Sequence, residues 1–306
     1  MRYWIYIGLI VTFLSCSEDH SSIPAEPGIN LNMAVTGDKH FEDYIHSLSV
    51  YAFKENGSGK YSYYRQVADL DSAGIAGLTT VENGDDWLTD YKSLTTKFPV
   101  GIYKLYFIAN TRIQVQGILQ EGVTSPEDIY LPYPAEGLTD SYFLGDFTVK
   151  NLGDNFSYPV ILDRAVSRLE MRLYEIPSAI STVELSVNNI ATRIDLDENL
   201  SGGPLTISRT VTLTNDDIYK TDSVVFNTLT FPSLGKSSVM TLTFRSKSGE
   251  VKTRMDDISL VPNKYLKLSG TVSHEPGSLL SFDVSFVYFL ALDWQDITVP
   301  DFVLKP

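Results

Sequence analysis

Apolar and polar residues alternate at a period of two along most of this chain, the pattern of β-strands with one buried face. The longest example is Leu280–Trp294, where every even position is apolar: Leu280, Phe282, Val284, Phe286, Tyr288, Leu290, Leu292 and Trp294. Odd positions begin polar and become apolar at Val287, Phe289 and Ala291, which predicts a strand covered on both faces toward its end. The alternation therefore predicts an all-β chain.

Shorter runs of the same kind fill both halves of the sequence, with turn residues between them. Asn56-Gly57-Ser58-Gly59 separates two strand patterns and predicts a hairpin, because Asn-Gly tolerates the positive φ of tight turns. In Phe98–Thr111 one face carries Tyr103, Leu105, Phe107 and Ala109, and in Asp163–Pro177 one face carries Leu169, Met171 and Leu173. Turns at these intervals are typical of β-sandwiches.

We therefore expect two tandem β-sandwich domains, residues 29–162 and 163–306, preceded by an acidic tether over residues 16–28. The pattern Ile29–Val35 predicts the first strand, with Ile29, Leu31, Met33 and Val35 on one face. Residues 68–94 read as loops with little regular structure, and a short helix is expected around Ile113–Leu119.

The N-terminus has the layout of a secretory signal, since Arg2 precedes an uncharged run, Tyr3–Leu14. That run is shorter than the roughly 20 apolar residues of a membrane-spanning helix. Leu14-Ser15-Cys16 resembles the bacterial lipobox, in which the cysteine thiol is joined to a diacylglycerol and the chain is cut just before it. We expect a signal peptide over residues 1–15 and a lipidated Cys16; the alternative is a signal peptide cut elsewhere.

The amino-acid composition supports export of the chain and excludes some classes of binding partner. Cys16 is the only cysteine among 306 residues, so the chain has no disulfide framework, and a free thiol would be a liability outside the cell. The formal net charge of −14 argues against binding nucleic acid, whose phosphates need a basic patch, and against electrostatic docking on anionic lipid. Ser17-Glu18-Asp19 resembles the acidic export signal of Bacteroidetes surface lipoproteins.

Several patterns, taken in order, resemble the fimbrillin family of Bacteroidales and, within it, the FimB-type lipoprotein anchor subunits. The resemblance is carried by the lipobox at Cys16, FPVGIYKLYFIANT (98–111), DRAVSRLEMRLYEIP (163–177), VPNKYLKLSGTV (261–272) and Trp294 in LALDWQDITVP. It implies two transthyretin-like β-sandwiches in a cell-surface fimbrium that assembles by strand exchange, in which one subunit's extended segment fills a groove in its neighbour.

One departure from the family pattern is informative. In polymerising relatives a trypsin-like protease removes the first strand after an Arg or Lys, which opens the groove. Here no Lys or Arg lies between Cys16 and Lys39, so we expect the first strand to be retained. The resemblance then implies the lipid-anchored base subunit, held at the outer membrane and facing the exterior. The alternative is that the uncut tether is only a spacer.

Such an anchor would have fimbrial stalk subunits as partners and, through the assembled pilus, a host or bacterial surface ligand. The candidate donor strand is Asp296–Leu304, with Ile297, Val299 and Val303 on one side and Phe302 and Leu304 on the other. Pro300 removes one ladder donor, which favours an edge or bent strand. The alternative is that this tail is simply the last strand of its own domain.

Residue patterns of catalysis are not evident, and we expect neither an enzyme nor a cofactor. The four histidines are scattered, and adjacent carboxylates such as Asp85-Asp86 do not create the two facing groups that glycoside hydrolysis needs. Asp195-x-Asp197-x-Asn199 begins like a calcium loop but lacks the Gly and Glu of an EF-hand, which leaves only a looser calcium site open. No metal is predicted.

Trp87 is the one candidate for glycan contact. It lies in a loop-rich region, where an exposed indole could stack on a sugar; the alternative is a Trp that covers one end of a sandwich. A surface lipoprotein that binds glycans for polysaccharide uptake is therefore the second function that the sequence suggests, and a hydrolase is a distant third.

Overall fold

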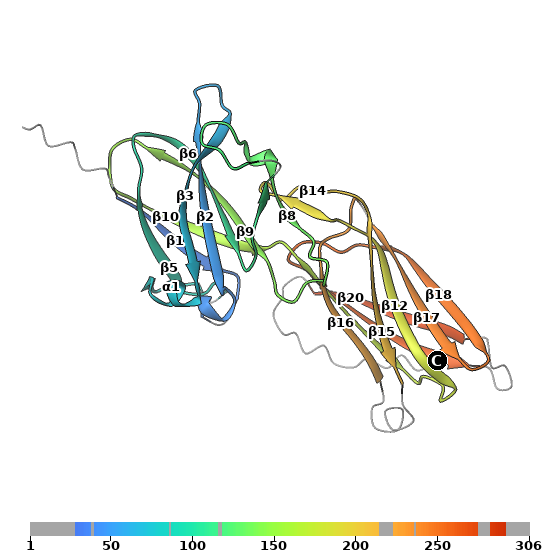
Figure 1. Cartoon of the computed structure of the whole chain (residues 1–306). Helices are drawn as coiled ribbons and strands as arrows, with labels where there is room; N and C mark the ends of the chain where they lie inside the picture. The colour runs from blue at the N-terminus through green and yellow to red at the C-terminus, as the bar shows by residue number, and fades with distance from the viewer. Residues whose placement is uncertain are drawn as a thin grey trace, which may run out of the picture.

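A computed structural model describes residues 28–37, 40–85, 87–115, 118–213, 223–235, 237–274 and 282–291 (Figure 1). The side chains of residues 273–274 and 282–291 are outside this description. We call residues 28–164 the N-terminal half and residues 165–291 the C-terminal half. Cys16, the tether before Gly28, Trp294 and the candidate donor strand lie outside the described residues.

The described residues of the N-terminal half form ten strands and three short helical turns. Its elements are β1 (Gly28–Val35), η1 (Phe41–Asp43), β2 (Ser47–Glu55), β3 (Tyr61–Asp71), α1 (Ser72–Ala76), β4 (Thr79–Val81), β5 (Tyr91–Lys97), β6 (Gly101–Ala109), β7 (Gln114–Val115), η2 (Pro126–Asp128), β8 (Ile129–Pro132), β9 (Phe143–Asn151) and β10 (Phe156–Arg164). Eight of the strands hydrogen-bond in the order β3-β2-β6-β9-β10-β1-β5-β4.

This sheet folds over into two layers around one core. Only the last residues of β10, Asp163 and Arg164, pair with β9, so β3-β2-β6-β9 and β10-β1-β5-β4 meet along that seam. Side chains from both layers form a buried cluster that includes Leu31 and Met33 of β1 and Leu105 and Phe107 of β6. On the side opposite this seam, the Arg65 guanidinium of β3 donates a hydrogen bond to the Lys97 carbonyl of β5. The first sandwich is thus held together at both edges.

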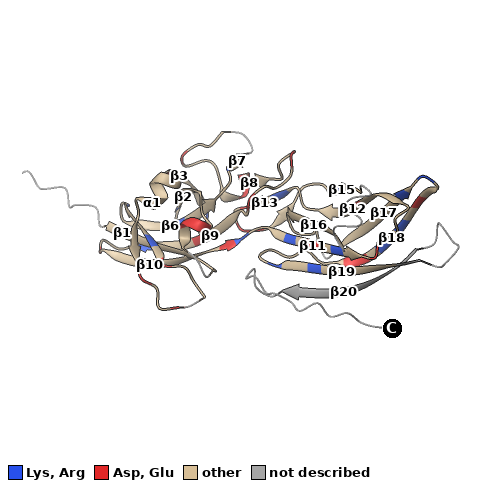
Figure 2. Cartoon of the chain, turned by 90° about the horizontal axis from the view of Figure 1, so that it is seen from below, with Lys and Arg blue, Asp and Glu red and all other residues tan. Residues whose placement is uncertain are grey.

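The C-terminal half is a second sandwich. Its elements are β11 (Ser167–Tyr174), β12 (Ile180–Ile190), β13 (Arg193–Asp195), β14 (Leu200–Ser201), β15 (Leu205–Thr212), β16 (Ser223–Thr230), β17 (Ser238–Ser246), β18 (Gly249–Ile258), β19 (Tyr265–His274) and β20 (Phe282–Ala291). The two sheets have the orders β16-β11-β19-β20 and β15-β12-β17-β18. Figure 2 shows basic residues along β11, β18 and β19.

A small fourth sheet, β14-β13-β8-β7, joins the halves, because β8 of the N-terminal half pairs with β13 of the C-terminal half. The outward faces of β2 and β6 complete the junction: Tyr51, Phe53, Tyr106 and Ile108 belong to the same buried cluster as the C-terminal core. Each of these strands therefore buries both faces, one in its own sandwich and one in the junction.

The prediction of an all-β chain built of β-sandwiches is confirmed, and the domain limits at 29–162 and 163–306 stay a prediction. The hairpin at Asn56–Gly59 is present, with Gly57 and Gly59 at φ of 81° and 75°. Tyr103, Leu105, Phe107 and Ala109 share the buried face expected of them. Among the described residues, no helix has the length and hydropathy to cross a membrane.

Two local predictions were wrong. Residues 68–94, expected as loops, contain the end of β3, α1, β4 and the start of β5; α1 begins because the Asp71 carboxylate accepts a hydrogen bond of 2.9 Å from the Gly74 amide. The helix expected around Ile113–Leu119 is absent from the described part of that range. Gln114 and Val115 form β7 instead, because their backbone pairs with β8.

Candidate functional site

The first strand, β1, occupies the middle of its layer. It pairs in parallel with β10, where Leu31 is opposite Tyr158, and antiparallel with β5, where Leu31 is opposite Leu94. Ile29, Leu31, Met33 and Val35 are all 0% exposed. Both edges of β1 and its inward face are therefore occupied within the chain.

Polar side chains fix the ends of β1. At its start, the Gly28 amide donates a hydrogen bond of 2.7 Å to Asn155 Oδ1. At its end, the Val35 amide donates to Thr89 Oγ1 at 3.2 Å, and Arg164 Nη1 donates to the Thr36 carbonyl at 3.5 Å. These contacts set the register of β1 against neighbours far away in sequence.

Arg164 lies at the seam between the two layers of the first sandwich. Its guanidinium carbon lies 5.1 Å from the centre of the Tyr44 ring and 5.0 Å from that of Phe143. Burial lowers the pKa of Arg164 to about 10, with the attraction of Tyr44 and Asp163 opposing the shift. The DRAV segment gave no local signal of a role for Arg164, because its contact with the Thr36 carbonyl at the end of the first strand joins residues far apart in sequence.

Trp87 is half exposed, with 51% of its surface accessible. Its carbonyl accepts a hydrogen bond of 3.1 Å from the Gly37 amide, and Leu88 forms a bridge with Thr36 just after β1. The backbone of Trp87 is thus fixed beside the end of β1, while the indole faces solvent in part. Glycan contact by Trp87 stays a prediction.

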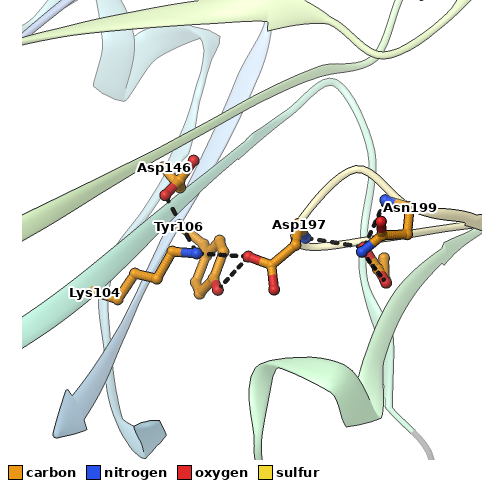
Figure 3. A network of polar contacts seen from close by, with 6 residues as sticks. Lys104, Tyr106, Asp146, Asp197 and Asn199 are labelled. Carbon is orange, nitrogen blue, oxygen red and sulfur yellow. Dashed lines mark hydrogen bonds and ion pairs between the residues drawn. The ribbon is translucent and has the colours of Figure 1, made fainter. Parts of the chain in front are cut away.

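The loop between β13 and β14, which resembled a calcium loop, instead makes a polar contact between the halves. Asp195 Oδ1 accepts hydrogen bonds from the amides of Asp197 and Asn199 at 3.0 and 2.8 Å, which closes the turn. Asp197 Oδ1 then accepts from Lys104 Nζ at 2.6 Å and from Tyr106 Oη at 2.8 Å (Figure 3). Lys104 Nζ also lies 3.4 Å from Asp146 Oδ2. We call Lys104, Tyr106, Asp146 and Asp197 the junction network.

Electrostatics in the junction network favour the ion pair. Burial alone would raise the pKa of Asp197, but the hydrogen bonds from Lys104 and Tyr106 outweigh it and hold that pKa below its ordinary value. Burial alone would likewise lower the pKa of Lys104, but the Asp197 carboxylate outweighs it and raises the pKa. In the neighbouring Glu198, burial raises the pKa, and the charges of Asp163 and Asp146 add to this rise. The loop therefore binds a cation that the protein itself supplies, Lys104.

No group of three or more His, Cys, Asp or Glu is arranged to hold a metal ion in the part of the chain that the structure describes. A shallow depression lies between the 133–137 segment and β15, lined by residues that include Tyr133, Glu136 and Arg209. It is open to solvent and contains no pair of facing carboxylates. The arrangement gives no basis for assigning catalytic residues.

We expect Asp197→Asn to weaken the contact between the halves, because Lys104 loses its closest anionic partner. The contact is partly exposed and screened, so the expected loss in free energy of unfolding is about 1 kcal/mol at pH 7. Since the pKa of Asp197 is lowered in the folded state, its contribution exists above the unfolded-state carboxyl pKa, near 4, and disappears as pH falls through the folded pKa.

The measurement is urea unfolding at pH 7 and again at pH 3, with Asp154→Asn in the exposed β9–β10 turn as the matched control. The control should match the unchanged protein at both pH values. A difference for Asp197→Asn that persists undiminished at pH 3 would contradict the assignment.

Comparisons with known proteins agree with this architecture. The family model described as fimbrillin-A associated anchor proteins Mfa1 and Mfa2 matches residues 24–285. Among curated proteins, no match is found.

Three solved structures share the fold at low identity. A protein from Bacteroides ovatus proposed as an adhesin has a TM-score of 0.60 and 15% identity, over 88% of this chain and 94% of that one. A proposed polysaccharide-binding protein from Bacteroides thetaiotaomicron has a TM-score of 0.56 and 15% identity, over 81% and 92%. The fimbrial anchor protein Mfa2 from Porphyromonas gingivalis has a TM-score of 0.53 and 13% identity, over 87% and 98%.

The structural neighbours show the fold, and the family model covers most of the chain, including β1, the junction between the halves and β19. The resemblance to fimbrillin anchor subunits that the sequence suggested is thereby confirmed. The chain belongs to the family of fimbrillin-A associated anchor proteins Mfa1 and Mfa2.

Proposed function

We propose that this fimbrial subunit is the lipid-anchored base of a fimbrium, which attaches the pilus to the outer membrane and ends its assembly. The observation that carries the proposal is the first strand. β1 is hydrogen-bonded on both edges and its four core side chains are 0% exposed, while no Lys or Arg precedes it after Cys16. A subunit that keeps this strand offers no vacant groove there, so a neighbour cannot add a strand in its place.

In this proposal the chain joins the fibre as a donor. The candidate donor strand, Asp296–Leu304, would enter the groove of the first stalk subunit, with Ile297, Val299 and Val303 on one side and Phe302 and Leu304 on the other. Main-chain hydrogen bonds would supply affinity, and alternate side chains would set the register. Because this subunit would donate a strand and accept none, growth of the fibre would stop at it.

Membrane attachment would come from lipid on Cys16. A terminus that bears more than one acyl chain is a stable anchor, whereas a single chain is marginal. The surface would face the cell exterior, where stalk subunits are the partners and the assembled pilus meets a host or bacterial ligand. Support comes from the lipobox and from membership in an anchor family.

Two variants distinguish attachment to the outer membrane from capture of a stalk subunit. Cys16→Ser should move the protein from the outer-membrane fraction to the soluble fraction while it still captures a stalk subunit in a pull-down. Deletion of residues 296–306 should leave the protein in the membrane and abolish capture. Ser21→Ala, in the same N-terminal segment, is the matched control and should change neither readout.

Three outcomes would each contradict a different part of the proposal. If Cys16→Ser stays in the outer membrane, lipid on Cys16 is not the anchor. If the shortened chain still captures the stalk subunit, the tail is not the donor, and if it unfolds, the tail belongs to its own domain.

Glycan binding is the second candidate, favoured by the half-exposed indole of Trp87 and by the fold shared with a proposed polysaccharide-binding protein. Retention on polysaccharide gels that is lost in Trp87→Ala, without capture of a stalk subunit, would favour it over the anchor.

A further inference from the structure

The end of the N-terminal half at which β1 begins carries two exposed aliphatic side chains on neighbouring turns. Val100, in the turn between β5 and β6, is 64% exposed, and Leu152, in the turn between β9 and β10, is 63% exposed. The two turns are adjacent because Gly101 pairs with Asn151. Gly28, the first described residue, pairs with Lys97 just before the first of these turns. Both aliphatic side chains thus flank the point where the chain enters the fold.

Hydrogen bonds brace the two turns against each other. The side chain of Asn151, a residue with 0% exposure, donates to the Phe98 carbonyl at 2.6 Å and to the Pro99 carbonyl at 3.2 Å. Its Oδ1 accepts from the Gly153 amide at 3.0 Å. The Gly28 amide is held in turn by Asn155 Oδ1. The two braced turns therefore present Val100 and Leu152 to solvent on adjacent turns, where their aliphatic surface is available for contact.

Among the described residues, the charges around the two turns are mainly basic. Basic residues around the two turns outnumber acidic ones: Lys54, Arg65, Lys97 and Lys150 against Glu55 and Asp154. Arg65 contacts the Lys97 carbonyl, and Lys150 precedes the braced Asn151. The tether adds Glu18, Asp19 and Glu26, so the charges at this end nearly balance, which suits a zwitterionic rather than an anionic headgroup layer.

We propose that the Val100 and Leu152 turns rest in the headgroup layer of the membrane that holds the lipid on Cys16. The inference rests on the proposed lipid anchor. Eleven residues lie between Cys16 and Gly28, and the stretch from one to the other spans at most about 40 Å when fully extended. Because Gly28 lies between the two turns, a lipid anchor keeps both turns close to the bilayer. Even weak insertion of the two aliphatic side chains is then favoured, since the effective concentration of the turns at the membrane is high.

This contact would orient the subunit. In Figure 1 the chain enters at one side of the N-terminal half and the C-terminal half extends from the other. Seating the entry end on the bilayer therefore points the C-terminal half away from the membrane, toward incoming subunits.

The test uses the lipidated full-length mature chain, in which Cys16 is blocked by lipid, so that an introduced cysteine is the only reactive thiol. Leu152→Cys and Val100→Cys are labelled with an environment-sensitive fluorophore. The matched control is Val225→Cys, an exposed aliphatic position on β16 in the C-terminal half. Each protein is reconstituted in phosphatidylcholine vesicles with and without a nitroxide-labelled phosphatidylcholine as quencher.

We expect labels at 152 and 100 to shift to the blue in vesicles and to lose intensity with the quencher, while the label at 225 does neither. Vesicle flotation is measured in parallel. Flotation without a shift or quenching at 152 and 100 would overturn this inference and leave the lipid anchor standing. Failure to float would overturn both. A shift that appears only when a stalk subunit is added would mean that these turns contact a protein, which also overturns the inference.

Discussion

Replacing both Leu31 and Met33 by alanine should lower the free energy of unfolding by about 4–10 kcal/mol, since each truncation of a fully buried side chain costs about 2–5 kcal/mol. Both residues are 0% exposed in β1. The loss approaches the whole stability of a typical domain, about 5–15 kcal/mol. We therefore expect the N-terminal sandwich of the double variant to be unfolded or nearly so at 37 °C.

The reason is the position of β1 rather than its length. It is the only strand in the described chain that pairs with both β10 and β5, so loosening it separates β5 and β4 from the rest of the first sandwich. Thermal unfolding followed by circular dichroism measures the effect, with Asn30→Ala as the control, because Asn30 is an exposed residue on the same strand.

A more direct experiment removes β1 from the chain and supplies it again as a separate peptide. A chain that begins after Thr36 should be unstable alone and regain folded signal when a peptide of residues 28–36 is added, because the vacant groove can be refilled in trans. If the double variant melts within a few degrees of the unchanged protein, β1 is not an essential part of the core, and the argument that the groove is closed is wrong.

Phe231→Ala should lower the free energy of unfolding by about 3–5 kcal/mol and also uncouple the halves. Phe231 is 0% exposed and follows β16 in the C-terminal half. Its ring centre lies 5.2 Å from that of Tyr133 at an interplanar angle of 88°, and 6.0 Å from that of Tyr142 at 69°. Both tyrosines belong to the N-terminal half, so the edge-to-face contacts cross the junction.

Urea unfolding distinguishes the two effects. We expect one transition in the unchanged protein and two in Phe231→Ala, because a cavity at the junction weakens the contact that makes the halves unfold together. Val225→Ala, on an exposed position of β16, is the matched control and should change the midpoint little. A single transition shifted by less than about 1 kcal/mol would contradict a central role for Phe231.

Local pattern was enough to identify most strands. The alternation in Phe98–Thr111 and Asp163–Pro177 reports burial on one face, and β6 and β11 lie within those ranges. It failed where a short segment takes its structure from a distant partner. Gln114 and Val115 span only two residues, too few for the β-propensity of Val115 to decide their structure, and they become β7 because β8 lies beside them. The helix α1 could have been found from Asp71, whose side chain caps it.

The candidate site was predictable only in part. The first strand could be read from Ile29–Val35, and its retention is predicted from the missing Lys and Arg. Lys104 and Tyr106 gave no signal, since in a strand pattern they are an ordinary outward pair. Their partner, Asp197, is 93 and 91 residues away in sequence. The spacing of Asp197 within its loop resembled that of a calcium ligand. Sequence spacing alone cannot show whether a carboxylate binds a metal ion or a lysine ammonium that the fold places beside it.

Sequence alone determined the β-rich character, the first strand, the lone cysteine at position 16 and the acidic composition of the stretch after it, which no arginine or lysine interrupts, because each is a property of neighbouring residues. Only the tertiary structure decided that β1 pairs in parallel with β10, that β8 and β13 join the halves, and that Val100 and Leu152 flank the entry of the chain. Strand partners are chosen by which buried faces and edges fit together across more than a hundred residues, and no local pattern carries that information.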